Sequence, residues 1–121
     1  MTISNKLAEW QEMLGLQEWR ISLHDCMSQK EMTEENAAGF TEFQEVNKTA
    51  RIDIMDPDEY GERVIPFDYE RILVHELLHL KLCLISETFG EDPLQERVAH
   101  QLIDDMARAL VAAKYSGVEY E

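Results

Sequence analysis

The sequence predicts a small α+β domain, in which one helix comes first, three strands follow and two long helices come last. Three observations lead to this prediction. Apolar residues recur at helical spacing near the N-terminus, short alternating segments lie between residues 19 and 55, and two long segments with helical patterning close the chain. At 121 residues the chain can form one hydrophobic core but not two, so we expect residues 1–121 to be a single domain.

The first half contains the predicted N-terminal helix and the predicted sheet. From Ser4 to about Leu14, apolar residues return every three or four positions, and Gly15 can end that helix. The next three segments have the pattern of short strands separated by polar loops or turns. Their sequences are WRISLHDCM (19–27), FTEFQEV (40–46) and TARIDIM (49–55).

The second half contains the two long helices. The segment from Tyr69 to about Ser86 is apolar on nearly every side, which is typical of a helix at the centre of a fold. The last helix is expected to start after Asp92 as its N-cap, with Pro93 at the first helical position. Its apolar stripe is predicted to consist of Leu94, Val98, Leu102, Ile103, Met106 and Leu110.

The formal net charge of −14 restricts the classes of partner. A chain this acidic is repelled by phosphate backbones and by anionic lipid, so we expect no nucleic-acid partner and no membrane partner. The N-terminal segment is amphipathic and contains acidic residues, unlike a secretory signal, and no apolar run reaches transmembrane length. Cys26 and Cys83 show no metal-type spacing, and the expected location is the cytoplasm.

The segment VHELLH, residues 74–79, places two histidines and a glutamate inside the apolar helix. His75 and His79 are four residues apart, so their imidazoles lie on one face and can converge on one ion. Glu76 projects to the side, where it can reach a water on that ion without binding the ion itself. This HExxH pattern is typical of zinc sites in which the histidines bind the metal and the glutamate acts as general base.

A catalytic zinc ion needs a third protein ligand and one open position. The possible donors after His79 are Glu87, Glu91, Asp92, Glu96, His100, Asp104 and Asp105. Glu96 and His100 are four apart on the last predicted helix, so both can face the same site. Glu96 follows His79 by 17 residues, which is enough chain to leave one helix, turn and return beside it.

These two motifs resemble those of the gluzincin group of zincin metallopeptidases. The pattern HELLH followed by a glutamate on the next helix is similar to their active-site helix and third ligand. The stretch ERVAHQLIDDMARAL is similar to the E-x-x-A-N segment of the ImmA/IrrE-type peptidases: Glu96 stands at the ligand position, Ala99 matches, and His100 replaces the asparagine. The resemblance covers roughly residues 49–110 and extends to small zincin-like proteins of phages and prophages.

The resemblance implies a minimal zincin-like domain with one zinc ion per chain, held by His75, His79 and Glu96. The role of His100 stays open between the third ligand, a support for a ligand, and a hydrogen-bond donor to the oxyanion. The implied activity is hydrolysis of peptide bonds by a zinc-bound water that Glu76 activates. For a phage-encoded protein, the expected location is the cytoplasm of the host cell.

The resemblance also suggests how a protein or peptide substrate would bind. In zincins the strand before the active-site helix is commonly an edge that pairs with extended substrate, and TARIDIM is the corresponding segment; an ordinary sheet strand is the alternative. No further C-terminal domain follows to supply the second wall of the cleft, which suggests either a narrow substrate range or a partner protein that completes the site. The candidates for a donor to the oxyanion are Tyr60, Tyr69, Tyr115 and His100.

Two other functions are compatible with the same residues. The main alternative is a non-catalytic zinc-binding protein, such as a regulator or assembly factor on a degenerate peptidase fold. Hydrolysis of a small amide is a weaker one. Glu76 favours an enzyme, because a purely structural zinc site gains nothing from a general base and closes its coordination with a fourth protein donor.

Overall fold

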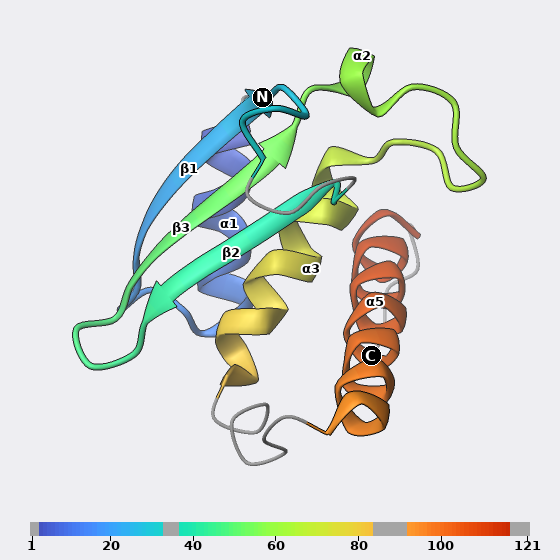
Figure 1. Cartoon of the computed structure of the whole chain (residues 1–121). Helices are drawn as coiled ribbons and strands as arrows, with labels where there is room; N and C mark the ends of the chain where they lie inside the picture. The colour runs from blue at the N-terminus through green and yellow to red at the C-terminus, as the bar shows by residue number, and fades with distance from the viewer. Residues whose placement is uncertain (1–2, 33–36, 84–91, 117–121) are drawn as a thin grey trace.

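The computed structural model describes residues 3–32, 37–83 and 92–116, and within them the predicted α+β order is confirmed (Figure 1). The N-terminal helix, the three strands and the two long helices all form near the predicted positions. A short helix after the third strand was not predicted. The elements are α1 (Ile3–Leu14), β1 (Arg20–Met27), β2 (Gly39–Gln44), β3 (Thr49–Met55), α2 (Pro57–Tyr60), α3 (Tyr69–Lys81) and α5 (Pro93–Tyr115).

Aspartates at three helix starts explain where these helices begin. The Asp68 carboxylate accepts a hydrogen bond from the backbone N–H of Arg71, and α3 starts one residue after Asp68. Asp92 does the same for α5, with Pro93 directly after it as predicted. Asp56 caps the short helix α2. Each carboxylate satisfies a backbone donor that the first helical turn leaves unpaired.

The sheet has the strand order β1-β3-β2, so β3 is its central strand. Strand β1 pairs with β3 in parallel, and β2 pairs with β3 antiparallel; Ile52 lies between Leu23 on one side and Thr41 on the other. Of the two interpretations of TARIDIM, which is β3, the substrate-pairing edge is therefore wrong and the ordinary sheet strand is confirmed. The physical reason is that β3 is paired on both sides, with β2 folding back along one side and β1 lying parallel along the other.

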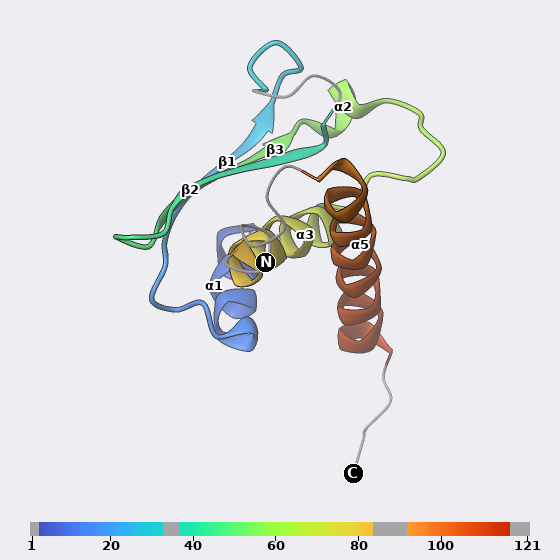
Figure 2. The same cartoon turned by 60° about the horizontal axis from the view of Figure 1, so that its bottom comes forward.

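Helices α1 and α3 cover one face of the sheet, and α5 packs against the outer side of α3 (Figures 1 and 2). The core between these layers includes the side chains of Trp10, Ile52, Ile54, Leu73 and Leu77, all almost fully buried. Helix α3 contributes to this core along its whole length, which explains why its sequence has almost no polar face. None of the described helices is both long and apolar enough to cross a bilayer.

The predicted apolar stripe of α5 is wrong in part. Ile103 is 2% exposed and packs in the core, where Met106 and Leu110 also make contact. Three other members of the stripe are exposed, by 64%, 56% and 54% of their surface: Leu94, Val98 and Leu102. These three residues are spaced four apart, so they lie on one face of α5. The face that contains Ile103 is a different one, and it packs against α3.

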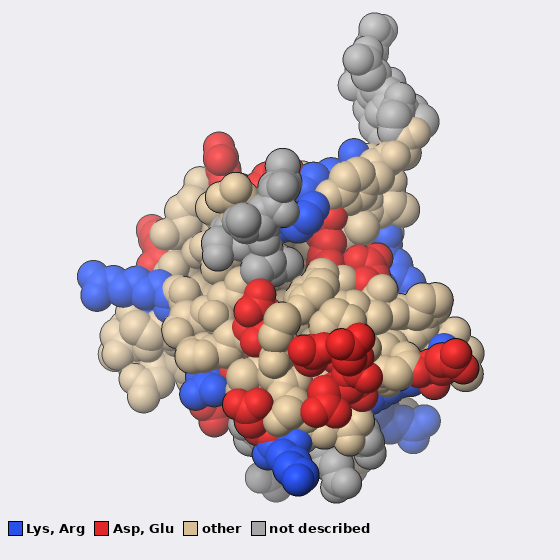
Figure 3. Space-filling view, turned by 90° about the horizontal axis from the view of Figure 1, so that it is seen from above, with Lys and Arg blue, Asp and Glu red and all other residues tan. Residues whose placement is uncertain are grey.

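Acidic side chains are prominent on the molecular surface, as the net charge of −14 requires. On the face seen from above, several Asp and Glu side chains gather close together near the middle of the view (Figure 3). Such a surface attracts cationic groups and repels phosphates.

A buried carboxylate joins the three long helices. Glu70, at the start of α3, is 6% exposed. One of its oxygens accepts hydrogen bonds from the Trp10 indole N–H of α1 at 2.7 Å and from Lys114 Nζ of α5 at 2.6 Å. The other oxygen accepts one from Lys6 Nζ of α1 at 3.3 Å. Burial by itself would raise the pKa of Glu70, but hydrogen bonds from Lys114, Tyr115, Trp10 and Lys6 lower it to about 2.

We expect the substitution Glu70→Gln to destabilise the fold by about 2 kcal/mol or more at pH 7, because two lysines then lose a carboxylate in a largely buried setting. The folded-state pKa lies below the ordinary carboxyl value of 4.5, so the stabilisation is complete above that value and is lost as the pH falls towards 2. Urea unfolding of both proteins at several pH values measures this effect. The difference between them should shrink in acid.

Glu9→Gln is the matched control for this prediction. The Glu9 carboxylate also contacts Lys114, at 2.8 Å, but its side chain is 37% exposed. An exposed ion pair contributes at most about 1 kcal/mol. Equal effects of the two substitutions, or a Glu70 effect that does not change with pH, would contradict the proposed role of the buried carboxylate.

Candidate metal centre

Helix α3 brings His75 and His79 onto one face, one turn apart. Their ring centroids are 5.1 Å apart, and both side chains are half-buried. The helical spacing of the HExxH segment alone accounts for this geometry. The two imidazoles lie on the side of α3 that faces α5, where the chain returns after residue 92.

Helix α5 adds a third imidazole to the pair. The His100 ring centroid lies 4.8 Å from that of His75 and 5.2 Å from that of His79. One potential ligand atom from each of the three histidines lies within 4.8 Å of the other two. Within residues 3–32, 37–83 and 92–116, this is the group of His, Cys, Asp and Glu side chains that converges closely enough to hold a metal ion.

The surroundings of the histidines favour the neutral form that binds metals. Burial, together with the neighbouring His75 and His100, lowers the pKa of His79 to about 4. Burial also lowers the pKa of His75, although a hydrogen bond to Asp104 opposes this shift. At neutral pH both side chains therefore have a lone pair available without first losing a proton. Three imidazole nitrogens fit zinc, which prefers nitrogen and sulfur donors.

Asp104 holds His75 in one orientation. The carboxylate lies 3.3 Å from His75 Nδ1 and 3.3 Å from an Arg71 guanidinium nitrogen, and it also contacts Arg108. Burial would raise the pKa of Asp104, but its bonds to Arg108 and His75 hold it below the ordinary value. An ionised carboxylate can only accept, so the proton of the neutral imidazole sits on Nδ1 and the lone pair on Nε2.

Glu76 lies beside the three histidines but is not part of their converging group. It is 6% exposed, and its carboxylate accepts a hydrogen bond of 2.7 Å from the Thr41 hydroxyl. The carboxylate also borders a pocket of about 250 Å³. This pocket is lined by Gly39, Phe40, Thr41, Phe43, Glu76, His79, Cys83, Glu96 and His100. The general base predicted from the HExxH pattern thus shares one cavity with two histidines.

Glu96 lines the same pocket, as expected from its place four residues before His100, but it lies outside the converging group, whereas His100, which is also exposed, belongs to that group. The geometry therefore favours His100 over Glu96 as the third ligand. The set of His75, His79 and Glu96 stays a prediction that metal analysis can test. Glu87 and Glu91, two other donors considered from the sequence, lie outside the described residues.

The tyrosines considered as donors to the oxyanion all have other hydrogen-bond partners. The Tyr69 hydroxyl lies 3.3 Å from Cys26 Sγ, and the Tyr60 hydroxyl donates to the backbone oxygen of Ile65 at 2.5 Å. The Tyr115 hydroxyl accepts a hydrogen bond from Lys6. None of the three borders the pocket. Among the candidates named from the sequence, only His100 is next to Glu76 in that cavity.

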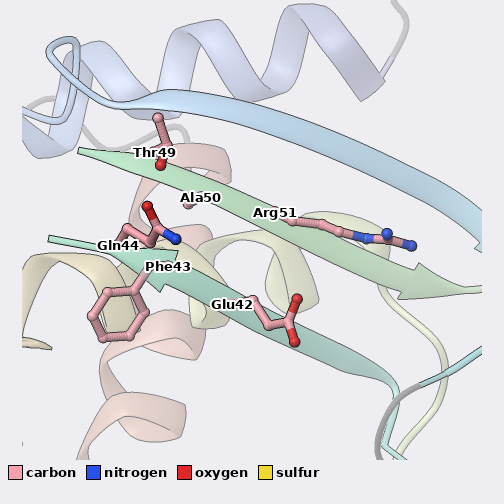
Figure 4. A pocket seen from close by; sticks show the side chains of 6 residues that line it. All are labelled: Glu42, Phe43, Gln44, Thr49, Ala50 and Arg51. Carbon is pink, nitrogen blue, oxygen red and sulfur yellow. The ribbon is translucent and has the colours of Figure 1, made fainter. Parts of the chain in front are cut away.

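A larger hollow of about 570 Å³ lies along strands β2 and β3 (Figure 4). It is lined by Glu42, Phe43, Gln44, Thr49, Ala50 and Arg51. Glu42 and Arg51 stand opposite each other on neighbouring strands, and Arg51 also pairs with Asp53. This hollow has charged groups that neutralise one another and no histidine, so the smaller pocket is the candidate site.

A scan of the chain against protein-family models found no match, and searches of the curated proteins and of the solved structures found no significant match either. The function therefore has to be inferred from the geometry and chemistry of the site.

We expect the purified protein to bind one zinc ion per chain, and to lose it when His75, His79 or His100 is changed to alanine, because each histidine supplies one of three nitrogen donors. Glu96→Ala is the matched control on the same helix face and should retain the metal. Metal analysis after dialysis measures this outcome. Zinc retained by His100→Ala but lost from Glu96→Ala would restore the ligand set expected from the sequence.

Asp104→Asn should weaken zinc binding on the order of 10–100-fold, because an amide is a poorer partner than a carboxylate for the Nδ1 proton of His75. Asp105→Asn is the control, since the neighbouring Asp105 is exposed. Competition with a chromophoric chelator gives both affinities. Equal affinities for the two variants would show that Asp104 does not support the metal centre.

Proposed function

We propose that this protein is a zinc-dependent peptidase in which three histidines hold the metal and Glu76 is the general base. The observation that carries the proposal is the placement of Glu76. Its carboxylate is 6% exposed, is held by the Thr41 hydroxyl and borders the same pocket as His79 and His100. A zinc site that only stabilises the fold does not need a carboxylate that is buried beside the metal ligands without binding the metal.

The chemistry of the residues suits attack of water on a peptide carbonyl. When bound, zinc would lower the pKa of a water and polarise the carbonyl of the substrate. Glu76 would take one proton from the attacking water as its oxygen forms the new bond to the carbonyl carbon. The C–N bond then breaks, and Glu76 returns that proton to the nitrogen of the leaving amine. Asp104 keeps His75 in the tautomer that leaves Nε2 for the metal.

The position of strand β2 suggests an extended peptide as substrate. Strand β2 is an outer strand of the described sheet, and its residues Gly39, Phe40, Thr41 and Phe43 border the pocket. A peptide could pair with the backbone of this edge and present its scissile bond to Glu76. The acidic surface disfavours nucleic acid (Figure 3), and the cytoplasmic location expected from the sequence belongs to the same proposal.

The alternative is a non-catalytic zinc protein, and one observation favours it. Glu96 lines the pocket beside His79 and His100, so it is close enough to the site to be considered as a fourth donor. Three histidines and a glutamate would close the coordination of zinc, as in structural sites, and leave no position for a water. X-ray absorption of the zinc-loaded protein distinguishes the two functions by the number of protein ligands.

We expect Glu76→Gln to keep the zinc and the fold but to lower peptide hydrolysis by roughly 10²–10⁴-fold, because the amide cannot accept the proton from water. The measurement is mass-spectrometric scoring of a broad peptide library incubated with zinc-loaded protein. Glu96→Gln is the control for loss of a negative charge in the same pocket. Cleavage at an unchanged rate by Glu76→Gln would rule out this role for Glu76.

A further inference from the structure

Strand β2 touches the proposed general base directly. The Thr41 hydroxyl donates to Glu76 Oε1 at 2.7 Å and lies 3.5 Å from the backbone oxygen of the same residue. Thr41 comes from the strand and Glu76 from helix α3, so this hydrogen bond crosses between two layers of the fold. A short bond from a hydroxyl to a carboxylate in a largely buried setting restricts how the carboxylate can rotate.

Gly39 shows how closely the strand approaches. A Cβ atom on Gly39 would lie 2.8 Å from Glu76 Oε2 and 2.8 Å from Ile72 Cγ2, both too short for real contacts. Gly39 and Thr41 are two apart in the strand, so they point to the same face. One face of β2 thus lies directly against the Glu76 carboxylate. Thr41 donates a hydrogen bond to Oε1, and the backbone of Gly39 lies close to Oε2.

We infer that Thr41 is a positioning residue that sets the orientation in which Glu76 exchanges protons; this inference rests on the proposed function. The distance and angle of a general base to its water determine its efficiency, and a displacement of about 1 Å is costly. Helix α3 holds the backbone of Glu76, and the Thr41 hydroxyl attaches the Glu76 side chain to a second element of the fold.

The substitution Thr41→Val tests this inference, because valine has the shape of threonine but no hydroxyl. Thr41→Ser keeps the donor and should behave like the wild type. Thr49→Val is the matched control, since Thr49 lies on the neighbouring strand and its hydroxyl bonds Asn47 instead. All variants are loaded with zinc, and zinc content and melting temperature are recorded for each.

The readout uses two small metal ligands in place of an unknown substrate. Acetohydroxamic acid gives its N–O–H proton to a nearby base as it chelates a metal in the form of acetohydroxamate, whereas azide binds a metal as an anion without a proton to give. We expect Thr41→Val to weaken acetohydroxamate by about tenfold, the effect of one hydrogen bond to a charged group, and to leave azide affinity unchanged. With any peptide that the wild type cuts, kcat should fall and KM should stay the same.

A purely structural role for Thr41 predicts a lower melting temperature with an unchanged ratio of acetohydroxamate to azide affinity, and this result would overturn the inference. Thr41→Ala serves in the same way where the valine variant does not fold. The variant Glu76→Gln distinguishes a failure of the role inferred for Thr41 from a failure of the proposed function. Selective loss of acetohydroxamate in Glu76→Gln but not in Thr41→Val would refute the role of Thr41 alone. No selective loss in Glu76→Gln would refute the role of Glu76 and with it the proposed function.

Discussion

The packing of α5 against α3 is the constraint on which the candidate site depends. Helix α3 alone supplies two imidazoles and a carboxylate, but the third imidazole comes from a helix that begins twelve residues after α3 ends. Ile103 and Ala107 are buried in this interface, and the small Ala107 side chain lets the two helices approach closely. His100 lies one turn before Ile103, so the same contact that buries Ile103 turns His100 towards the other two histidines.

Polar contacts set the relative position of the two helices, which run in opposite directions (Figure 1). Lys114 near the end of α5 binds Glu70 at the start of α3, and Asp104 in the middle of α5 contacts Arg71 and His75. Apolar packing alone tolerates a shift of one helix along the other, whereas such a shift would leave these buried charges without partners. The paired charges therefore fix the register that places His100 opposite His75 and His79.

The features predicted correctly from the sequence are those that depend on local pattern. Alternation predicted the bounds of β3, and Asp92 as N-cap predicted the start of α5, because a strand face and a helix cap are set by residues a few positions apart. Sequence spacing could not choose between Glu96 and His100. Both lie on the same helix face, and only the position of α5 against α3 brings one closer.

The incorrect predictions concern features that depend on contacts between distant segments. TARIDIM was expected at an edge and forms the central strand, since strand order depends on contacts between distant segments. The stripe of Leu94, Val98 and Leu102 was expected in the core because apolar residues there recur at helical spacing. His100 and Asp104 of α5 contact His75 of α3 instead, and the apolar periodicity of α5 gave no sign of these polar contacts. The sequence predicted Asp104 only as a possible metal donor. Its place four residues after His100 puts both side chains on the same face of α5, and this spacing could have predicted its contact with His75.

The number and charge of the metal ligands determine what a bound cation could do chemically. Three neutral imidazoles bring no charge, so they can lie within van der Waals reach of one another without the repulsion that three carboxylates would suffer. A divalent cation would then keep most of its positive charge, and that charge is what lowers the pKa of water and polarises a carbonyl. A glutamate added to the three histidines as a fourth ligand would both neutralise part of the charge and fill the open position. Glu96 is not part of the converging group of three histidines, which agrees with the proposed catalysis, and the Thr41 hydroxyl holds the carboxylate that we propose as the base.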